Sequence, residues 1–353
     1  MLPTDEEVGV PGALRVALPA TLLAAGLVAG CGAVGNSAEH RAADQRAVAP
    51  AGPAVAPPGG PAPVGTVVPL GSPATAVVVD PRTRTVAVAL LSPPRLMLTA
   101  LDDATSVRQI PLPGPAADLV LAESGALLVP VTAPGCLIRV PLEGGTPSRT
   151  DLDGVPRGAV ALGDVTVVAL GDRLAVFDGN RPRGTIRGFV DAARVVPAGI
   201  RTGTKVAVLD RARTAVSVVD VSSGQISPTL RAGNGASNAV ADRFGRTLVT
   251  DTRDGELLAF AGDPPMLRQR FPLPGAPYGL AYDGQRDLAW VTLTAHDEVV
   301  GLGVAGGEPV ILHRFPTVHQ PDAVAVDPVS GRVLVVSASG AGLQIIDPGR
   351  VVQ

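Results

Sequence analysis

The sequence predicts an all-β fold, a seven-bladed β-propeller of four-stranded antiparallel blades, from three observations. Short Val-rich segments alternate with turns rich in Asp, Gly and Pro roughly every 8–12 residues. The same order of segments recurs along residues 66–353. Each copy spans about 41 residues, because Asp80 in the first copy and Asp327 in the last are 247 residues and six intervals apart. Repeats of this length with four strands are typical of propellers.

Each copy supplies an apolar strand, a turn, a second Val-rich strand and a third strand such as AVSVVD, and most copies add a fourth such as RQIPL. The first copy reads PATAVVVDPRTRTVAVAL and the last reads PDAVAVDPVSGRVLVV. The copies begin at Pro73, Pro115, Pro156, Asp191, Ala236, Pro277 and Pro321.

The two ends of the repeat region predict how the last blade is completed. The last copy stops after its third strand, Leu343 to Asp347, whereas TVVPL, Thr66 to Leu70, precedes the first copy and reads like a fourth strand. We expect this N-terminal strand to pair beside Leu343 to Asp347 and close the last blade, which leaves no open sheet edge there.

Residues 1–30 read as a lipoprotein signal peptide. Val16 to Gly30 carry no charge and follow Arg15, but fifteen residues are too few for a bilayer span of roughly 20. Val28-Ala29-Gly30-Cys31 resembles the bacterial lipobox, in which signal peptidase cuts before a lipidated cysteine. The resemblance implies that Cys31 carries a diacylglyceryl group with palmitate-type chains, which would hold the protein at the extracytoplasmic face of the cell membrane.

Residues 31–65 are predicted to be the lipidated Cys31 followed by a disordered tether. They include AVAPAGPAVAPPGGPAPVG and no aromatic residue, so they offer little surface to bury. Residues 66–353 form the propeller. After removal of the signal peptide the net charge changes from −3 to about −1, because Arg15 is lost with Asp5, Glu6 and Glu7. This charge indicates no nucleic-acid partner.

Three segments resemble the YVTN-type repeat of bacterial surface and periplasmic propellers: VLDRARTAVSVVDVSSGQ from Val208, VTLTAHDEVVGLGV from Val291 and VVSASGAGLQIIDP from Val335. The chain lacks the Asn of that motif and most of its Tyr. Together with the lipobox, the whole is similar to actinobacterial propeller lipoproteins of the mycobacterial LppL kind. That resemblance implies an envelope protein without an assigned reaction.

The loops between copies, and those between second and third strands, open on one face of a propeller, which is the usual ligand face. Charged and polar residues gather there in copies three to six, whereas copies one, two and seven offer small neutral loops. Binding residues on rigidly held loops are a common arrangement. The predicted site for a partner or ligand is Arg157, Arg194, Asn238, Tyr278, His296, His319 and Asp322.

Specific catalytic motifs are missing, and we predict no cofactor. The leading hypothesis is a membrane-anchored binding or scaffold module for an unknown envelope protein or small ligand. The first alternative is a metal-dependent, lactonase-like hydrolase in which His296 and His319 converge with Asp322 on a metal ion. The second is a quinone-cofactor dehydrogenase, which a single Trp disfavours. DTRDGE, from Asp251, looks only faintly like a calcium loop.

Overall fold

The computed structural model describes residues 47–103, 107–200 and 203–351, and every regular element in these ranges is a β-strand. The described residues belong to one unit of the chain, Ala38–Gln353. The predicted signal peptide, residues 1–30, and Cys31 lie outside them. Within the described ranges, no helix has the length and hydropathy to cross a bilayer.

The strands form five four-stranded antiparallel sheets and one eight-stranded sheet. The first sheet contains β2 (Ala74–Asp80), β3 (Thr85–Leu91), β4 (Pro94–Ala100) and β5 (Val107–Pro111). The second contains β6 (Val120–Leu121), β7 (Ala126–Val131), β8 (Cys136–Pro141) and β9 (Ser148–Asp151).

The eight-stranded sheet contains β10 (Gly158–Leu162), β11 (Val165–Ala169), β12 (Gly171–Asp178), β13 (Arg181–Pro197), β14 (Lys205–Asp210), β15 (Ala215–Asp220), β16 (Gln225–Ile226) and β17 (Leu230–Arg231). Its long strand β13 pairs with β12 through one part and with β14 through the other. One continuous strand therefore joins two copies of the repeat where the sequence predicts a loop.

The remaining sheets follow in chain order. One contains β18 (Ala236–Ala241), β19 (Thr247–Asp251), β20 (Glu256–Ala261) and β21 (Met266–Pro272). The next contains β22 (Pro277–Asp283), β23 (Leu288–Leu293), β24 (Glu298–Gly303) and β25 (Val310–Pro316). The last contains β26 (Pro321–Val326), β27 (Val333–Ser337), β28 (Leu343–Ile346) and the N-terminal strand β1 (Thr66–Val68).

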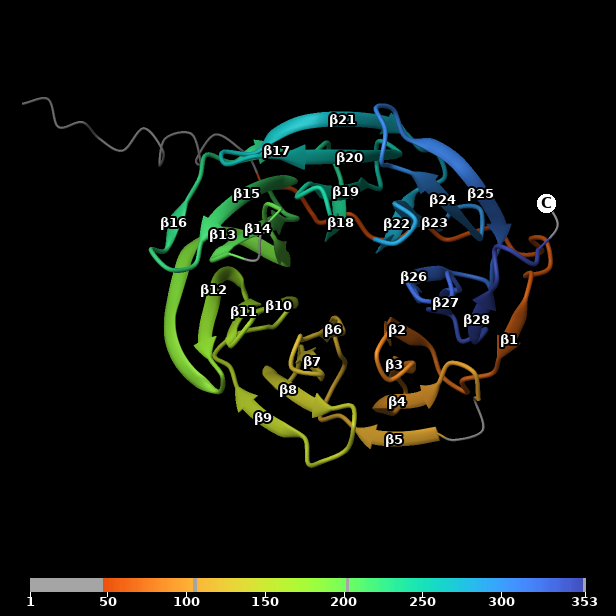
Figure 1. Cartoon of the computed structure of the whole chain (residues 1–353), viewed down its shortest axis with the longest axis horizontal. Helices are drawn as coiled ribbons and strands as arrows, with labels where there is room; N and C mark the ends of the chain where they lie inside the picture. Colours follow the sequence, from red (N-terminus) through yellow and green to blue (C-terminus); the bar gives the residue numbers. More distant parts are fainter. Residues whose placement is uncertain (1–46, 104–106, 201–202, 352–353) are drawn as a thin grey trace, which may run out of the picture. The chain divides into compact units, whose positions relative to one another are not determined.

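The sheets are arranged around a common centre (Figure 1). The strands β2, β6, β10, β13, β18, β22 and β26 line this centre, and each contacts the next, with β26 contacting β2. The apolar cores lie between neighbouring sheets, as where Val77 of β2 packs in one cluster with Leu334 of β27. Because a sheet is covered on both faces, its middle strands are largely buried, and Leu288–Leu293, Thr292 included, is buried throughout.

The strand β1 lies at the outer edge of the last sheet and pairs antiparallel with β28, with Val67 opposite Gln344. This is the pairing expected for Thr66 to Leu70. The buried side chain of Gln344 reinforces it, since its amide donates to the carbonyl oxygens of Val64, at 2.7 Å, and Pro316, at 3.0 Å.

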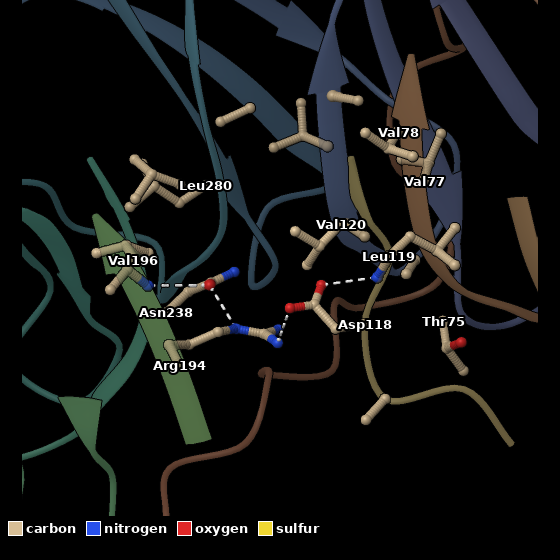
Figure 2. A pocket seen from close by; sticks show the side chains of 18 of the residues that line it. Thr75, Val77, Val78, Asp118, Leu119, Val120, Arg194, Val196, Asn238 and Leu280 are labelled. Atoms are coloured by element: carbon tan, nitrogen blue, oxygen red, sulfur yellow. Dashed lines mark hydrogen bonds and ion pairs between the residues drawn. The ribbon is translucent and has the colours of Figure 1, made fainter. Parts of the chain in front are cut away.

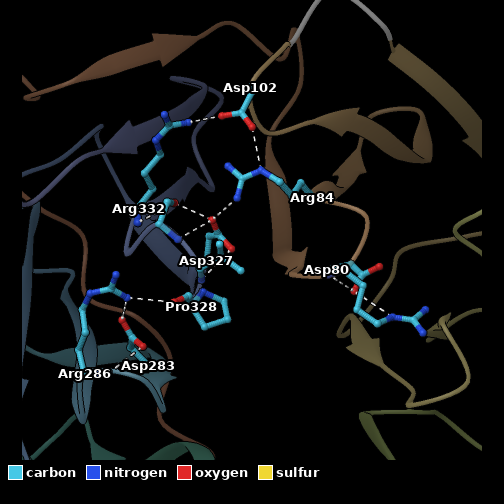
Figure 3. A network of polar contacts seen from close by, with 11 residues as sticks. Asp80, Arg84, Asp102, Asp283, Arg286, Asp327, Pro328 and Arg332 are labelled. Carbon is cyan, nitrogen blue, oxygen red and sulfur yellow. Dashed lines mark hydrogen bonds and ion pairs between the residues drawn. The ribbon is translucent and has the colours of Figure 1, made fainter.

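An ion-pair network connects the first and last sheets on the face of the β2–β3 and β26–β27 turns (Figure 3). Arg84 lies 3.0 Å from the buried carboxylate of Asp327 and 2.8 Å from Asp102, which Arg332 also contacts at 2.8 Å. Burial opposes ionisation of Asp327, but hydrogen bonds from Ser330 and the charge of Arg84 hold its pKa below the usual range. Residues far apart in sequence thus stabilise the junction between the chain's two ends.

Part of the segment predicted to be a disordered tether contacts the β structure. Residues 47–56 lie against the loops of the opposite face, and the side chains of Ala51 and Ala56 are buried (Figure 1). Composition correctly indicates that the segment has no core of its own. It becomes ordered because side chains of the β structure bind its main chain, as described below.

Replacing Gly342 by Ala should weaken the contact between β1 and β28. Gly342 has a φ of 116°, and a Cβ there would lie 2.6 Å from the carbonyl oxygen of Val68. We expect Gly342→Ala to lower the free energy of unfolding by about 3 kcal/mol, measured by denaturant titration. Gly163→Ala is the control, because Gly163 also has positive φ but has open space around it, and should cost about 1 kcal/mol. Equal losses would contradict a tight approach at this edge.

Candidate functional site: a central channel with a polar rim

A local irregularity recurs where the innermost strands begin. The pairing register shifts within the first residues of β2, β18, β22 and β26, and at the corresponding part of β13. Such bulges leave an extra residue on one strand and re-aim side chains. The sequence predicts Arg194, Asn238, Tyr278 and Asp322 in loops between copies; they lie instead in these strands, at or beside the bulges.

These strands enclose a cavity of about 630 Å³ at the centre of the molecule. Its deeper wall is apolar and includes Val78, Val120, Val196 and Leu280 (Figure 2). Its rim is polar, because each copy contributes one side chain there, from the start of its innermost strand or from the loop just before it. These are Thr75, Asp118, Arg157, Arg194, Asn238, Tyr278 and Asp322.

Arg194 is the most highly connected side chain of the rim (Figure 2). Its Nε donates to the Oδ1 of Asn238 at 2.8 Å, and its Nη1 lies 2.9 Å from the Oδ2 of Asp118. Asp118 is held in turn by the backbone N–H of Leu119, at 2.9 Å. Burial raises the pKa of Asp118, and the charge of Arg194 opposes that rise. The guanidinium is thus fixed against the cavity by partners on two other sheets.

Two more arginines line the same cavity. Arg157 lies 3.5 Å from Asp191 and is exposed toward solvent. Arg211 comes from the β14–β15 loop, and its buried Nε has no hydrogen-bond partner within the described structure. Burial lowers the pKa of Arg211, and the charges of Arg194 and Arg157 add to this effect. The rim therefore concentrates three positive charges on one side of the cavity.

Tyr278 and Asp322 lie at the rim on neighbouring strands, β22 and β26. Tyr278 is half-buried, which suits an amphipathic contact. Burial raises the pKa of Asp322 to about 6, and a hydrogen bond from the side chain of Gln320, at 3.1 Å, opposes the rise. Asp322 therefore gains its negative charge only near neutral pH.

Two of the predicted site residues do not line the cavity. His319 pairs through Nδ1 with the Oδ2 of the buried Asp297 at 2.7 Å, and the Nδ1 of His296 lies 3.9 Å from Glu298. The expected convergence of both histidines with Asp322 on a metal ion is wrong, because each histidine faces a carboxylate of the β23–β24 hairpin region instead.

Within the described residues, the one group of three side chains that could hold a metal is Asp251, Asp254 and Glu256 of the β19–β20 hairpin. Its members have protein partners. Asp251 accepts the N–H of Asn234 at 2.8 Å, the Asn234 amide donates to Asp254, and Arg270 lies 2.7 Å from Glu256. These three side chains therefore stabilise the β19–β20 turn, which agrees with a spacing of acidic residues that does not match a calcium loop.

Asp118, Thr75 and Arg211 were missed as site residues by sequence reasoning. A usable signal exists for the first two, because Thr75 and Asp118 lie near the start of copies one and two, as Arg157, Arg194 and Asn238 lie near the start of later copies. Arg211 gives no such signal. It comes from a different loop and reaches the cavity only through the tertiary fold.

No protein-family model and no curated protein matches the sequence. Solved structures resemble the fold at low identity. Hydrazine synthase of Kuenenia stuttgartiensis matches with a TM-score of 0.67 and 13% identity, over 80% of this chain and 98% of that one. Virginiamycin B lyase from Staphylococcus aureus has a TM-score of 0.64 and 13% identity, with 80% and 98% covered. Its catalytically inactive histidine-to-alanine variant with quinupristin has a TM-score of 0.65 and 12% identity, with 79% and 97% covered. These likenesses support a propeller-like fold.

Asp322 should make stability depend on pH in a defined direction. Its folded pKa of about 6 lies above the unfolded value, so the stability that neutral Asp322 contributes is fully present below about pH 4 and lost as the pH rises through about 6. As the pH rises from about 4 to about 6, we expect the free energy of unfolding of Asp322→Asn to increase by about 2 kcal/mol relative to that of the wild type. This figure allows for solvent screening at the open rim. Denaturant titration at both pH values measures the gain.

Glu308→Gln is the control, since Glu308 is exposed and outside the cavity lining. A pH-independent difference between Asp322→Asn and the wild type would contradict burial of this carboxyl.

Proposed function

We propose that the protein is a seven-bladed propeller that acts as an extracytoplasmic binding module, and that its central channel takes an anionic ligand or an acidic group of a partner. The blade count follows if the eight-stranded sheet is two blades joined by β13, added to the five four-stranded sheets. The pairing of β1 with β28 and the contact of β26 with β2 support closure of this ring.

The observation that carries the binding role is the placement of Arg157, Arg194 and Arg211 on one side of a cavity. Guanidinium groups bind carboxylate, sulfate and phosphate oxygens through paired N–H donors. The apolar wall beneath them would accept the hydrocarbon part of a ligand, with Tyr278 at the boundary. A carboxylate with a small apolar body is the ligand class that this geometry fits best.

Sulfate is a suitable probe of the arginines, because its charge is constant near neutral pH. Isothermal titration at constant ionic strength should show saturable binding to the wild type. Arg157→Gln with Arg194→Gln should weaken binding by about tenfold or more. The control is Arg82→Gln with Arg350→Gln, two arginines on the opposite face whose side chains are 54% and 84% exposed. Equal loss in both double variants, or no binding to the wild type, would reject the proposal.

We further propose that the chain is a lipoprotein of the actinobacterial propeller type, anchored through Cys31 in the cell membrane. The support is the sequence Val28-Ala29-Gly30-Cys31 after an apolar segment. Two acyl chains are enough for stable anchoring.

Cys31→Ala removes the thiol that would accept the diacylglyceryl group. We expect the variant to stay uncleaved or to be shed, which fractionation of the producing cells with detergent phase separation would show. A mature, membrane-partitioning Cys31→Ala protein would contradict the anchor.

A second candidate function is general acid–base catalysis by the Asp297–His319 pair. The 2.7 Å contact fixes one ring nitrogen of His319 and leaves a half-exposed imidazole, the arrangement of an oriented base. A lyase of similar fold is inactive when a histidine is replaced by alanine. We rank this role second because His319 does not line the cavity.

A further inference from the structure

Residues 47–56 run along the loops of the β14–β15, β19–β20 and β23–β24 hairpins and the β25–β26 loop, on the face opposite the β2–β3 and β26–β27 turns. The contacts are made to the main chain of the segment rather than to functional groups of its side chains. Two amides of the segment donate hydrogen bonds: Val48 N–H to the carbonyl of Ala212 (2.7 Å) and Ala54 N–H to Thr294 Oγ1 (2.9 Å). Three of its carbonyls accept hydrogen bonds from side chains: Ala49 from Arg253 (2.5 Å), Ala51 from Arg211, and Ala54 from Gln320 (2.6 Å).

Two side chains of the segment are buried, and most of the others are exposed. Ala51 and Ala56 are each 4% exposed, whereas Val55 between them is 80% exposed. A larger residue at either buried position would have no room without displacing the segment. The loops thus form a groove that recognises an extended backbone and requires small residues at two positions.

The composition of the segment suits such a groove. Pro50, Pro53 and Pro57 restrict φ and favour an extended conformation, which lowers the entropy lost on docking. Main-chain hydrogen bonds with pockets for alternate side chains are a general mode of peptide recognition. Residues 47–56 therefore have the properties of a peptide ligand that is covalently attached to its receptor.

Two groove residues connect the groove to the channel. Arg211 binds the carbonyl of Ala51 and lines the cavity, and Gln320 binds both the carbonyl of Ala54 and the carboxylate of the rim residue Asp322. Docking of the segment consequently fixes the position of one of the three channel arginines.

We propose that the loops beside the channel rim form a peptide-binding groove, that residues 47–56 are its resident ligand, and that docking of this segment strengthens anion binding through Arg211. The last part rests on the proposed function of the channel, whereas the groove does not. A fixed guanidinium loses less entropy when it binds an anion. By reciprocity, an anion in the channel holds the segment in place.

The test compares two variants of the full chain. Ala51→Gln with Ala56→Gln fills the two buried positions and should release the segment. Ala47→Gln with Val55→Gln makes equally polar, uncharged changes at exposed positions and should leave it docked. A fluorescein-labelled peptide of sequence AVAPAGPAVAP, residues 47–57, should bind the released variant at least tenfold more tightly than the wild type or the control, because the resident segment competes at high local concentration. Fluorescence anisotropy measures this.

Absence of saturable peptide binding to the released variant, or equal binding to all three proteins, would overturn the groove. Hydrogen exchange measured on the wild type gives a second test, which does not depend on whether a variant folds. The amides of Val48 and Ala54 should be protected, and exchange at the rate of an unstructured peptide would also overturn it.

Sulfate titration of the same proteins tests the coupling. We expect the released variant to bind sulfate about threefold or more weakly than the control. Equal sulfate affinities would overturn the coupling. The peptide-binding result would then decide whether the groove exists. If no protein binds sulfate, the channel proposal fails together with the coupling, and the peptide result alone decides the groove.

Discussion

The antiparallel pairing of β1 with β28 is the interaction on which the other features of the structure depend. Each sheet buries apolar side chains on both faces, so it is stable only with a neighbour on each side. The first and last sheets can cover one another only if the two ends of the chain meet, and β1 then occupies an edge that would otherwise expose unpaired N–H and C=O groups. The Arg84–Asp327 pair stabilises the same junction on the turn face.

This arrangement explains how three arginines can share one cavity. Like charges near one another repel, and burial of Arg211 adds a desolvation cost, which its lowered pKa expresses. Flexible loops would separate such groups. Here Arg194 belongs to a central strand and is held by Asp118 and Asn238 from other sheets. A rigid cluster of three guanidinium groups, two of them paired with Asp118 and Asp191, is preorganised for an anion, since binding would reduce their mutual repulsion without rearrangement.

Much of the fold could be predicted from the sequence, because period-2 alternation, turn residues and a repeat of about 41 residues are local signals. The pairing of Thr66 to Leu70 with the last copy could be inferred by counting strands. The fusion of two copies through β13 could not, since nothing in its composition separates a bulged continuous strand from two strands and a loop. Order in residues 47–56 was also beyond prediction, because it comes from groups such as Arg211 and Gln320 far along the chain.

The candidate site could likewise be predicted only in part from the sequence. Residues near the start of a copy were found in copies three to seven, as with Arg194 and Tyr278, and overlooked in copies one and two, as with Asp118. His296 and His319 were wrongly predicted to belong to the site. Their loop positions indicate on which face of the molecule they lie, but not which carboxylate each one contacts, as the contact of His319 with Asp297 shows.

The most direct test of an anion-binding channel is the position of a bound anion. Crystals of the protein soaked in selenate, which is an anomalous scatterer with the shape and charge of sulfate, would locate it without reference to affinity. The account predicts an anomalous peak inside the channel within hydrogen-bond distance of Arg194 and of Arg157 or Arg211. Peaks confined to surface arginines of the opposite face, with none in a channel open to solvent, would contradict it.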